Sequence, residues 1–170
     1  MMSNVVVGVA DCKWSRTPGE VLITYALGSC IAVTLHDPLM QVAGMLHYML
    51  PDSRIDRLKA DRRPFMFADT GVPILVQRLC EMGGCANRMT VRVAGGAQVL
   101  DTNGHFDIGR RNYVALREIL QNAGLMIHAE NVGGIASRTV SLDVTTGRVL
   151  WREADGGEGE LMINRDRGRV

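Results

Sequence analysis

The sequence is poor in aromatic residues and has no marked excess of either charge. Only 5% of its 170 residues are Phe, Trp or Tyr, so the core must be built from aliphatic side chains and the 10 methionines. Lys and Arg number 19 and Asp and Glu number 18, which gives a net charge of +1. Because binding to a phosphate backbone needs a clear basic excess, this balance argues against nucleic acid as a partner.

Long apolar runs are missing as well. No run approaches the roughly 18 residues that a membrane-spanning helix needs, so we expect no membrane insertion. The first residues, Met1–Asn4, lack the basic and apolar stretches of a secretory signal. We therefore expect a cytoplasmic protein whose cysteines stay reduced.

The spacing of cysteine, histidine and glycine excludes the common cofactor motifs. No two of the four cysteines form a C-x-x-C pair and the four histidines are scattered, so the pattern of a structural zinc site is missing. Gly95-Gly96 and Gly133-Gly134 do not have the spacing of a dinucleotide fingerprint or a P-loop. We interpret these pairs as tight turns or close backbone approaches, and we expect neither a metal nor another cofactor.

The remaining composition is that of a globular domain, with 46% hydrophobic and 22% charged residues. Short apolar or alternating runs predict eight strands, two of them in a hairpin, at about 5–10, 21–27, 30–36, 41–50, 89–94, 125–131 and 138–151. Apolar residues at helical spacing predict two helices, at about 71–82 and 110–123. The mixture favours the α+β class: a layered sandwich of mixed, mostly antiparallel β-sheet with two main helices covering one side.

No internal repeat or linker divides the chain, so residues 1–155 are predicted to form a single domain. Residues 156–170 form a tail rich in glycine and charge, with a short edge strand predicted at Glu160–Asn164. Eight of the twelve residues 52–63 are charged, five basic and three acidic. This segment is predicted to be an exposed, mobile connector; the alternative is a lid or a loop that faces a partner.

Cys30 and His47 form the candidate site. If the turn between their strands is centred between Pro38 and Leu39, Cys30 lies directly opposite His47 in an antiparallel pair. Side chains in that relation have Cβ atoms about 4.5–5.5 Å apart. The same register places the alternate residues of Ile31–Leu35 on one apolar face, which supports it.

A thiol beside an imidazole is the smallest unit for nucleophilic catalysis. The imidazole takes the thiol proton, and the resulting ion pair favours a thiolate that attacks an amide or ester carbonyl. The Gly28-Ser29 turn before Cys30 leaves backbone amides free to stabilise an oxyanion. Thr24, on the preceding strand, is available to orient the other nitrogen of His47.

Structural roles for the same residues are the alternative. A single cysteine on a strand is usually a small core residue, and a single histidine is usually structural. A one-residue bulge in the hairpin would turn the two side chains to opposite faces. Ser29 is a weaker candidate nucleophile, because a serine after glycine is typical of a turn.

At these residues the chain resembles the chemoreceptor glutamine deamidase family, CheD. The resemblance extends from about Val5 to Arg152 and depends on an ordered set of motifs rather than on any one of them. In chain order these are Thr24, Leu27-Gly28-Ser29-Cys30, Asp37-Pro38, His47-Tyr48-Met49-Leu50-Pro51, Ala68-Asp69-Thr70, Gly95-Gly96-Ala97, Ile108-Gly109, Arg111-Asn112, Gly133-Gly134 and Thr146-Gly147.

The resemblance implies a protein-glutamine glutaminase that converts selected glutamines of methyl-accepting chemotaxis receptors to glutamate and releases ammonia. The family's nucleophile falls on Cys30, its histidine on His47 and its third catalytic residue on Thr24. The resemblance also implies a CheC-type chemotaxis phosphatase as a partner, and some members are credited with receptor methylester hydrolysis.

Two departures and two alternative functions accompany this resemblance. The family commonly has Asp where this chain has Asn131, and Asn where it has Ile135. These differences bear on loop geometry and on substrate or partner preference. The chain is alternatively a binding module that engages and stimulates the phosphatase, with hydrolysis secondary, or a protein in which Cys30 is structural or senses redox state. The basic residues of 52–63 are a hypothetical docking site for an acidic helical partner.

Overall fold

The computed structural model describes residues 2–98 and 107–163, and within them ten strands form two five-stranded sheets. The first sheet has the order β1 (Ser3–Val6), β3 (Glu20–Leu27), β8 (Arg138–Asp143), β9 (Val149–Glu153), β10 (Glu158–Glu160). The second has the order β2 (Asp11–Ser15), β5 (Val42–Tyr48), β4 (Ile31–Asp37), β6 (Thr90–Gly95), β7 (Ile127–Val132). Neighbouring strands are antiparallel except in the pairs β1–β3 and β6–β7, so the predicted mixed, mostly antiparallel sheets are confirmed.

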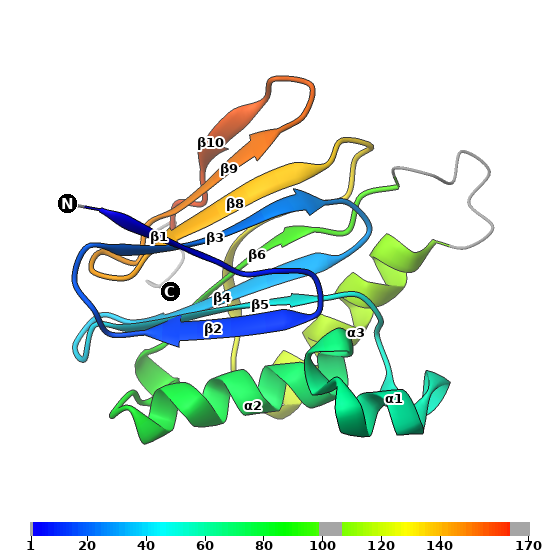
Figure 1. Cartoon of the computed structure of the whole chain (residues 1–170), viewed down its shortest axis with the longest axis horizontal. Coiled ribbons are helices and arrows are strands. Elements are labelled where there is room, and N and C mark those ends of the chain that lie inside the picture. Colours follow the sequence, from blue (N-terminus) through cyan, green and yellow to red (C-terminus); the bar gives the residue numbers. More distant parts are fainter. Residues whose placement is uncertain (1, 99–106, 164–170) are drawn as a thin grey trace, which may run out of the picture.

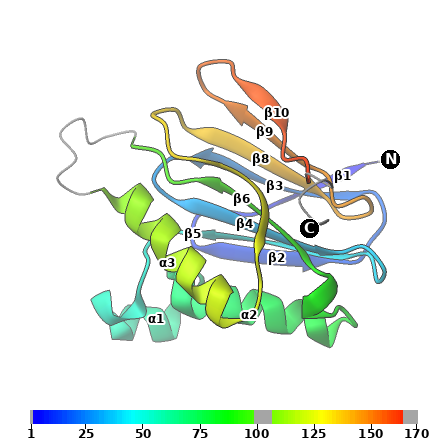
Figure 2. The same ribbon diagram turned by 180° about the vertical axis from the view of Figure 1, so that it is seen from behind.

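Two long helices, α2 (Ala68–Glu81) and α3 (Ile108–Asn122), lie against the second sheet and away from β8–β10 (Figures 1 and 2). Leucines from both helices pack on the apolar face of β4 and β5, with members such as Leu75, Leu79, Leu116 and Leu120. A second cluster fills the space between the two sheets. The layers are therefore sheet, sheet and helices, which confirms the predicted α+β sandwich. None of the helices in the described ranges is both long and apolar enough to cross a membrane.

The hairpin of β4 and β5 forms as predicted, but its register differs by two residues. Ala32, not Cys30, lies opposite His47, and the closing pair is Asp37 with Val42. Because side chains alternate along a strand, a shift of two leaves every residue on its predicted face. Cys30 itself precedes the first paired residue, Ile31, and packs against the inter-sheet cluster that contains Ala32, the partner of His47.

The turn itself explains the shift. The Asp37 carboxylate accepts hydrogen bonds from the amides of Leu39 and Met40, at 2.9 and 3.2 Å. Gln41 closes the loop with a positive φ of 50°. These contacts centre the turn one residue later than the sequence predicts.

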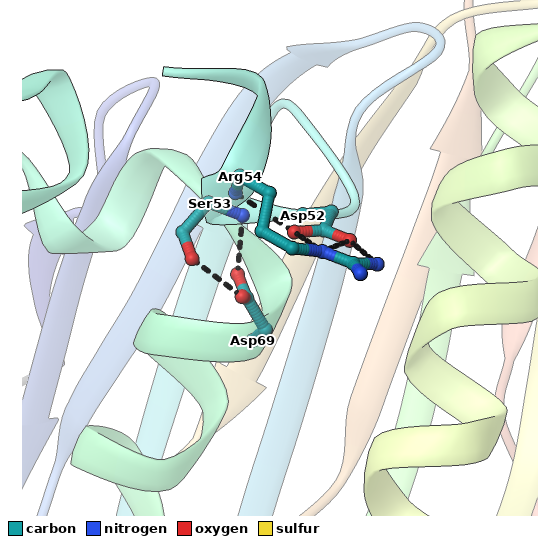
Figure 3. Close-up of polar contacts among 4 residues, drawn as sticks. All are labelled: Asp52, Ser53, Arg54 and Asp69. Atoms are coloured by element: carbon teal, nitrogen blue, oxygen red, sulfur yellow. Dashed lines mark hydrogen bonds and ion pairs between the residues drawn. The ribbon is translucent and has the colours of Figure 1, made fainter. Parts of the chain in front are cut away.

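The charged segment 52–63 is mostly exposed, as its composition predicts, but it forms helical turns rather than an irregular connector. It forms a 3-10 turn, η1 (Ser53–Ile55), and a short helix, α1 (Arg57–Arg62), followed by η2 (Pro64–Met66). Figure 3 shows the hydrogen bonds that connect η1 to α2: Asp69, in the first turn of α2, accepts from the backbone amide and the hydroxyl of Ser53, at 2.9 and 2.6 Å. Asp52 binds the guanidinium of Arg54 beside it.

Smaller differences concern the edges of the sheets. Strand β2 is not among the strands that the sequence predicts. The first strand ends at Val6, although the apolar run continues to Ala10. The tail contributes β10, which begins two residues earlier than the predicted edge strand and ends at Glu160. The last residue of that prediction, Asn164, lies outside the described residues. A 3-10 turn, η3 (Ala86–Arg88), joins α2 to β6.

Candidate functional site

The structure brings Thr24 and His47 together across the space between the sheets. Thr24 is on β3 of the first sheet and His47 is on β5 of the second, and both side chains are fully buried. The Thr24 hydroxyl oxygen lies 2.8 Å from Nδ1 of the His47 ring. The predicted orienting contact is therefore present.

The hydrogen bonds of Thr24 determine which nitrogen of His47 carries the proton. The Thr24 hydroxyl lies 2.7 Å from the carbonyl oxygen of Val7 and donates to it. A hydroxyl has one proton, so Thr24 can only accept from the ring, and Nδ1 of His47 must be the protonated nitrogen. Nε2 then carries a free lone pair. It is buried and has no hydrogen-bond partner among the described residues.

The third candidate residue, Cys30, is not hydrogen-bonded to Nε2 of His47. It directly precedes β4 and is half-buried. Within the described ranges, the sulfur makes no hydrogen bond to Nε2 of His47. The expected pair is therefore open in this structure.

Burial keeps both groups neutral. It lowers the pKa of His47 to about 4, although the Asp11 carboxylate on the neighbouring strand β2 acts in the opposite direction. Burial also raises the pKa of the Cys30 thiol, against a smaller effect of its own backbone amide. At neutral pH the resting pair is thiol and imidazole, not the ion pair that the sequence predicts. Any proton transfer must therefore accompany the arrival of a substrate.

The turn that carries Cys30 is held by its carbonyl groups. Those of Gly28, Ser29 and Cys30 accept, in that order, from the Ala97 amide, the Asn112 side chain and the Gly96 amide, at 2.9, 3.0 and 2.8 Å. In a trans peptide the N–H points away from the C=O, so these bonds also fix the directions of the Ser29 and Cys30 amides. Neither amide donates to a carbonyl among the described residues. Within the part of the chain that the structure describes, these two N–H groups therefore have a fixed direction and no carbonyl partner.

Gly95 makes this arrangement possible. A Cβ at this position would lie 2.3 Å from the carbonyl oxygen of Cys30, and the residue has a positive φ of 113°. Only glycine fits such an approach without strain. The interpretation of Gly95-Gly96 as a close backbone approach is therefore confirmed.

Sequence reasoning missed Asn112 as a member of this site. It lies on α3 and is fully buried, and its side-chain amide contacts both the Cys30 turn and the end of β5. A detectable signal exists: Asn112 is four residues before Leu116 and eight before Leu120, so it is a polar residue on the apolar face of the helix.

The departure at Asn131 lies in a second polar cluster. Arg138, whose side chain is 3% exposed, forms an ion pair with Glu153 at 2.9 Å and donates to the carbonyl of Gly133 at 2.8 Å. Its guanidinium also donates to Oδ1 of Asn131. A neutral amide therefore occupies a place where the resemblance expects a carboxylate, while Ile135 is exposed to solvent.

Two shallow grooves border the helix α3. One, of about 410 Å³, lies between η1 and α3 and is lined by residues such as Asp52, Asp69 and Arg110. The other, of about 380 Å³, includes Gly96, Tyr113 and Gly133. Neither is lined by Thr24, Cys30 or His47. Within the described part of the chain, no three His, Cys, Asp or Glu side chains are grouped as metal ligands would be.

Comparison with known proteins gives consistent results. A family model described as "CheD chemotactic sensory transduction" matches residues 49–153. A protein of Solibacter usitatus, named "Probable chemoreceptor glutamine deamidase CheD", is 50% identical over 161 residues, which is 95% of each chain. A protein of Syntrophus aciditrophicus with a name of the same kind is 43% identical over 160 residues, 94% of this chain and all of its own.

A third relative carries the name without the qualifier "probable". The "Chemoreceptor glutamine deamidase CheD" of Thermotoga maritima is 39% identical over 153 residues, 90% of this chain and 94% of its own. The family model begins two residues after His47, so it leaves the three candidate residues outside its match. An alignment over 95% of the chain, by contrast, necessarily runs through residues 24–47.

Proposed function

The chain belongs to the CheD family, and on that premise we propose that it hydrolyses glutamine side chains of methyl-accepting chemotaxis receptors to glutamate and ammonia. Three relatives bear the name of a chemoreceptor glutamine deamidase. Cys30 is the proposed nucleophile, His47 the general base and acid, and Thr24 the residue that orients His47. The observation that carries this assignment is the buried Nε2 of His47, which has no hydrogen-bond partner among the described residues, together with the packing of Cys30 against the inter-sheet cluster that contains Ala32, the partner of His47.

The reaction starts with proton transfer from the Cys30 sulfur to Nε2 of His47. The sulfur bonds to the carboxamide carbon of the substrate, and the negative charge moves to its oxygen. The amides of Ser29 and Cys30, which have no carbonyl partner among the described residues, are the proposed donors to that oxygen. The C–N bond then breaks, and the imidazolium gives its proton to the leaving nitrogen, which departs as ammonia.

Water completes the cycle. Nε2 of His47 takes a proton from a water molecule, whose oxygen attacks the thioester carbon. The C–S bond breaks, and the sulfur recovers its proton from the imidazolium, so a glutamate remains on the receptor. The open distance between the sulfur and Nε2 fits this scheme, because catalytic hydrogen bonds often tighten only when substrate is bound.

A receptor fragment analysed by mass spectrometry tests the function. The protein should convert selected glutamines to glutamates, and Cys30→Ala should abolish the conversion. A Cys80→Ala variant serves as the control, because Cys80 is an exposed thiol on the far helix α2. If the Cys30→Ala variant deamidates as well as the unmodified protein, the proposed nucleophile is wrong.

The second part of the proposal concerns partners. We infer a CheC-type phosphatase from the resemblance, and the same Cys30→Ala variant separates the two alternatives. If hydrolysis is the main role, the variant binds the phosphatase but does not support adaptation. If binding is the main role, adaptation survives in cells that carry the variant.

The helix α1 is the proposed docking element for an acidic helical surface. Arg57, Arg62 and Arg63 are exposed, and Ile55 and Leu58 are exposed apolar residues beside them. Arg54 and Lys59 are instead near Asp52 and Asp56. Neutralising Arg57, Arg62 and Arg63 should weaken receptor binding and reduce its dependence on salt, whereas unchanged affinity and salt dependence would exclude docking by this helix.

A further inference from the structure

The side chain of Asn112 joins the two chain segments that carry the proposed reacting groups. Its Nδ2 donates one proton to the carbonyl oxygen of Ser29, at 3.0 Å, and one to that of Met49, at 2.8 Å. Ser29 directly precedes Cys30, and Met49 follows His47 by two residues. One amide group on α3 therefore bridges the start of β4 and the end of β5.

This bridge is located where the strands no longer pair with each other. The last pair of the β4–β5 ladder is Ile31 with Tyr48, so Cys30 has no cross-strand partner on β5. Beyond Tyr48 the chain turns away, since the amides of Met49 and Leu50 both donate to the carbonyl of Met66. The Asn112 amide takes the place of the missing ladder bond at this end of the hairpin.

We propose that Asn112 is the residue that positions Cys30, and the direction of its amide, relative to His47; this inference rests on the proposed function. The carbonyl of Ser29 and the N–H of Cys30 belong to one planar peptide unit. Holding the carbonyl therefore aims the N–H at the oxyanion that forms on the substrate. Asn112 does not touch the reacting atoms itself, because its side chain is buried beneath the turn.

The surroundings of Asn112 hold it firmly. The Tyr48 hydroxyl donates to the backbone carbonyl oxygen of Asn112 at 2.7 Å, so β5 is bonded directly to the helix at this residue. One turn earlier, Gly109 lets the helix approach the carbonyl of Gly96, which a Cβ would meet at 2.4 Å. Helix α3 is thereby fixed to both sides of the turn that carries Cys30.

An unsatisfied atom distinguishes this role from simple packing. Oδ1 of Asn112 is buried and has no hydrogen-bond partner among the described residues. An orphaned acceptor of this kind costs free energy, which a leucine of similar size would avoid. The retained amide therefore serves its two donor bonds, which a leucine cannot make.

The test compares Asn112→Leu with Leu116→Ala, a fully buried position one turn further along the same helix, whose apolar side chain donates no hydrogen bond to the Cys30 turn or to the end of β5. Asn112→Leu should lower kcat for receptor deamidation roughly 100-fold and leave KM nearly unchanged, because substrate binding does not use the bridge. Leu116→Ala should lower the melting temperature and leave kcat unchanged below it. If Asn112→Leu does not fold, Asn112→Ala takes its place.

Alkylation of Cys30 by iodoacetamide across pH gives a second readout that does not need the receptor. Asn112→Leu releases the turn that carries Cys30 and so reduces the burial that raises the pKa of its thiol. The alkylation profile of this variant should therefore shift to lower pH, whereas that of Leu116→Ala should match the unmodified protein. Profiles for Asn112→Leu and the unmodified protein that coincide would overturn the inference. So would an unchanged kcat in Asn112→Leu.

The two readouts separate the inference from the proposed function. If the unmodified protein fails to deamidate receptors, the proposed function is wrong, and the alkylation profiles alone decide whether Asn112 positions Cys30. If deamidation requires Cys30 but not Asn112, the function stands and the positioning role is excluded.

Discussion

The hydroxyl oxygen of Thr24 lies 2.8 Å from Nδ1 of His47, and this contact connects the two β-sheets. Thr24 in turn donates to the Val7 carbonyl, so its hydroxyl has a defined direction. The orientation of the imidazole is therefore set by a residue of the opposite sheet. A proton acceptor held in this way needs no reorganisation when a substrate arrives.

Thr24→Val should reduce activity without removing the fold. Valine has nearly the same shape but cannot accept from Nδ1, so the ring loses its fixed tautomer and orientation. We expect kcat for deamidation to fall roughly 100-fold, with KM little changed. The matched control is Thr34→Val, at a buried threonine on β4 of the second sheet, whose hydroxyl donates to the Arg92 carbonyl at 3.1 Å. Equal effects of the two changes would refute an orienting role for Thr24.

The buried imidazole should make the fold sensitive to acid. In the unfolded chain His47 takes up a proton near its ordinary pKa of about 6.5, whereas in the folded protein the pKa is about 4. The stabilisation that depends on neutral His47 is therefore fully present above the pKa of the unfolded chain, and it is lost as the pH falls to the pKa of the folded protein. The loss over this window is about 3 kcal/mol in the free energy of unfolding.

Urea unfolding at pH 7 and pH 4.5 measures this effect. His47→Gln should be less stable at the higher pH but should lose less stability between the two, because glutamine does not titrate. The other histidines are unchanged in the variant, so the difference isolates His47. An equal loss in both proteins would mean that the imidazole titrates normally.

Gly95→Ala should be more damaging than Gly133→Ala. Both glycines have positive φ, at 113° and 82°, but a Cβ on Gly133 meets nothing within 4 Å, whereas one on Gly95 overlaps the Cys30 carbonyl. We expect a loss of about 1 kcal/mol at Gly133 from backbone strain alone. At Gly95 the loss should be roughly 3 kcal/mol or more, because steric overlap is added to that strain. Denaturant unfolding of the two variants provides the comparison.

The Arg138 cluster predicts opposite effects for two substitutions. Arg138→Met leaves the Glu153 carboxylate and the Gly133 carbonyl without their partner, and should cost about 3–5 kcal/mol. Asn131→Asp replaces a neutral acceptor with a charged one beside the same guanidinium, and should raise the free energy of unfolding by about 1 kcal/mol. Chemical unfolding at neutral pH checks both values, and a destabilised Asn131→Asp variant would contradict this reading of the cluster.

The sequence predicted the elements of the site better than their exact spacing. Thr24 and His47 meet as expected, whereas Cys30 lies just before the first paired residue of β4 and is not opposite His47. The register was off by two because it depends on the Asp37 side chain capturing the Leu39 and Met40 amides. Such a local contact does not change the apolar pattern, so the pattern cannot reveal it.

Two other features depend on contacts between distant segments. Asn112 is 82 residues from Cys30 in the sequence, and only the packing of α3 brings it to the turn. The turn η1, which leads into α1, is held in place because Asp69 of α2 accepts from the amide of Ser53, 16 residues earlier in the chain. Single-sequence periodicity carries no information about either contact.

The Thr24–His47 bond has one more consequence, which concerns heat. The aliphatic side chains between the sheets tolerate a small slide of one layer over the other, since their contacts are not directional. A hydrogen bond does not, because it weakens steeply with misalignment. Warming should therefore impair turnover at temperatures where the folded state still predominates.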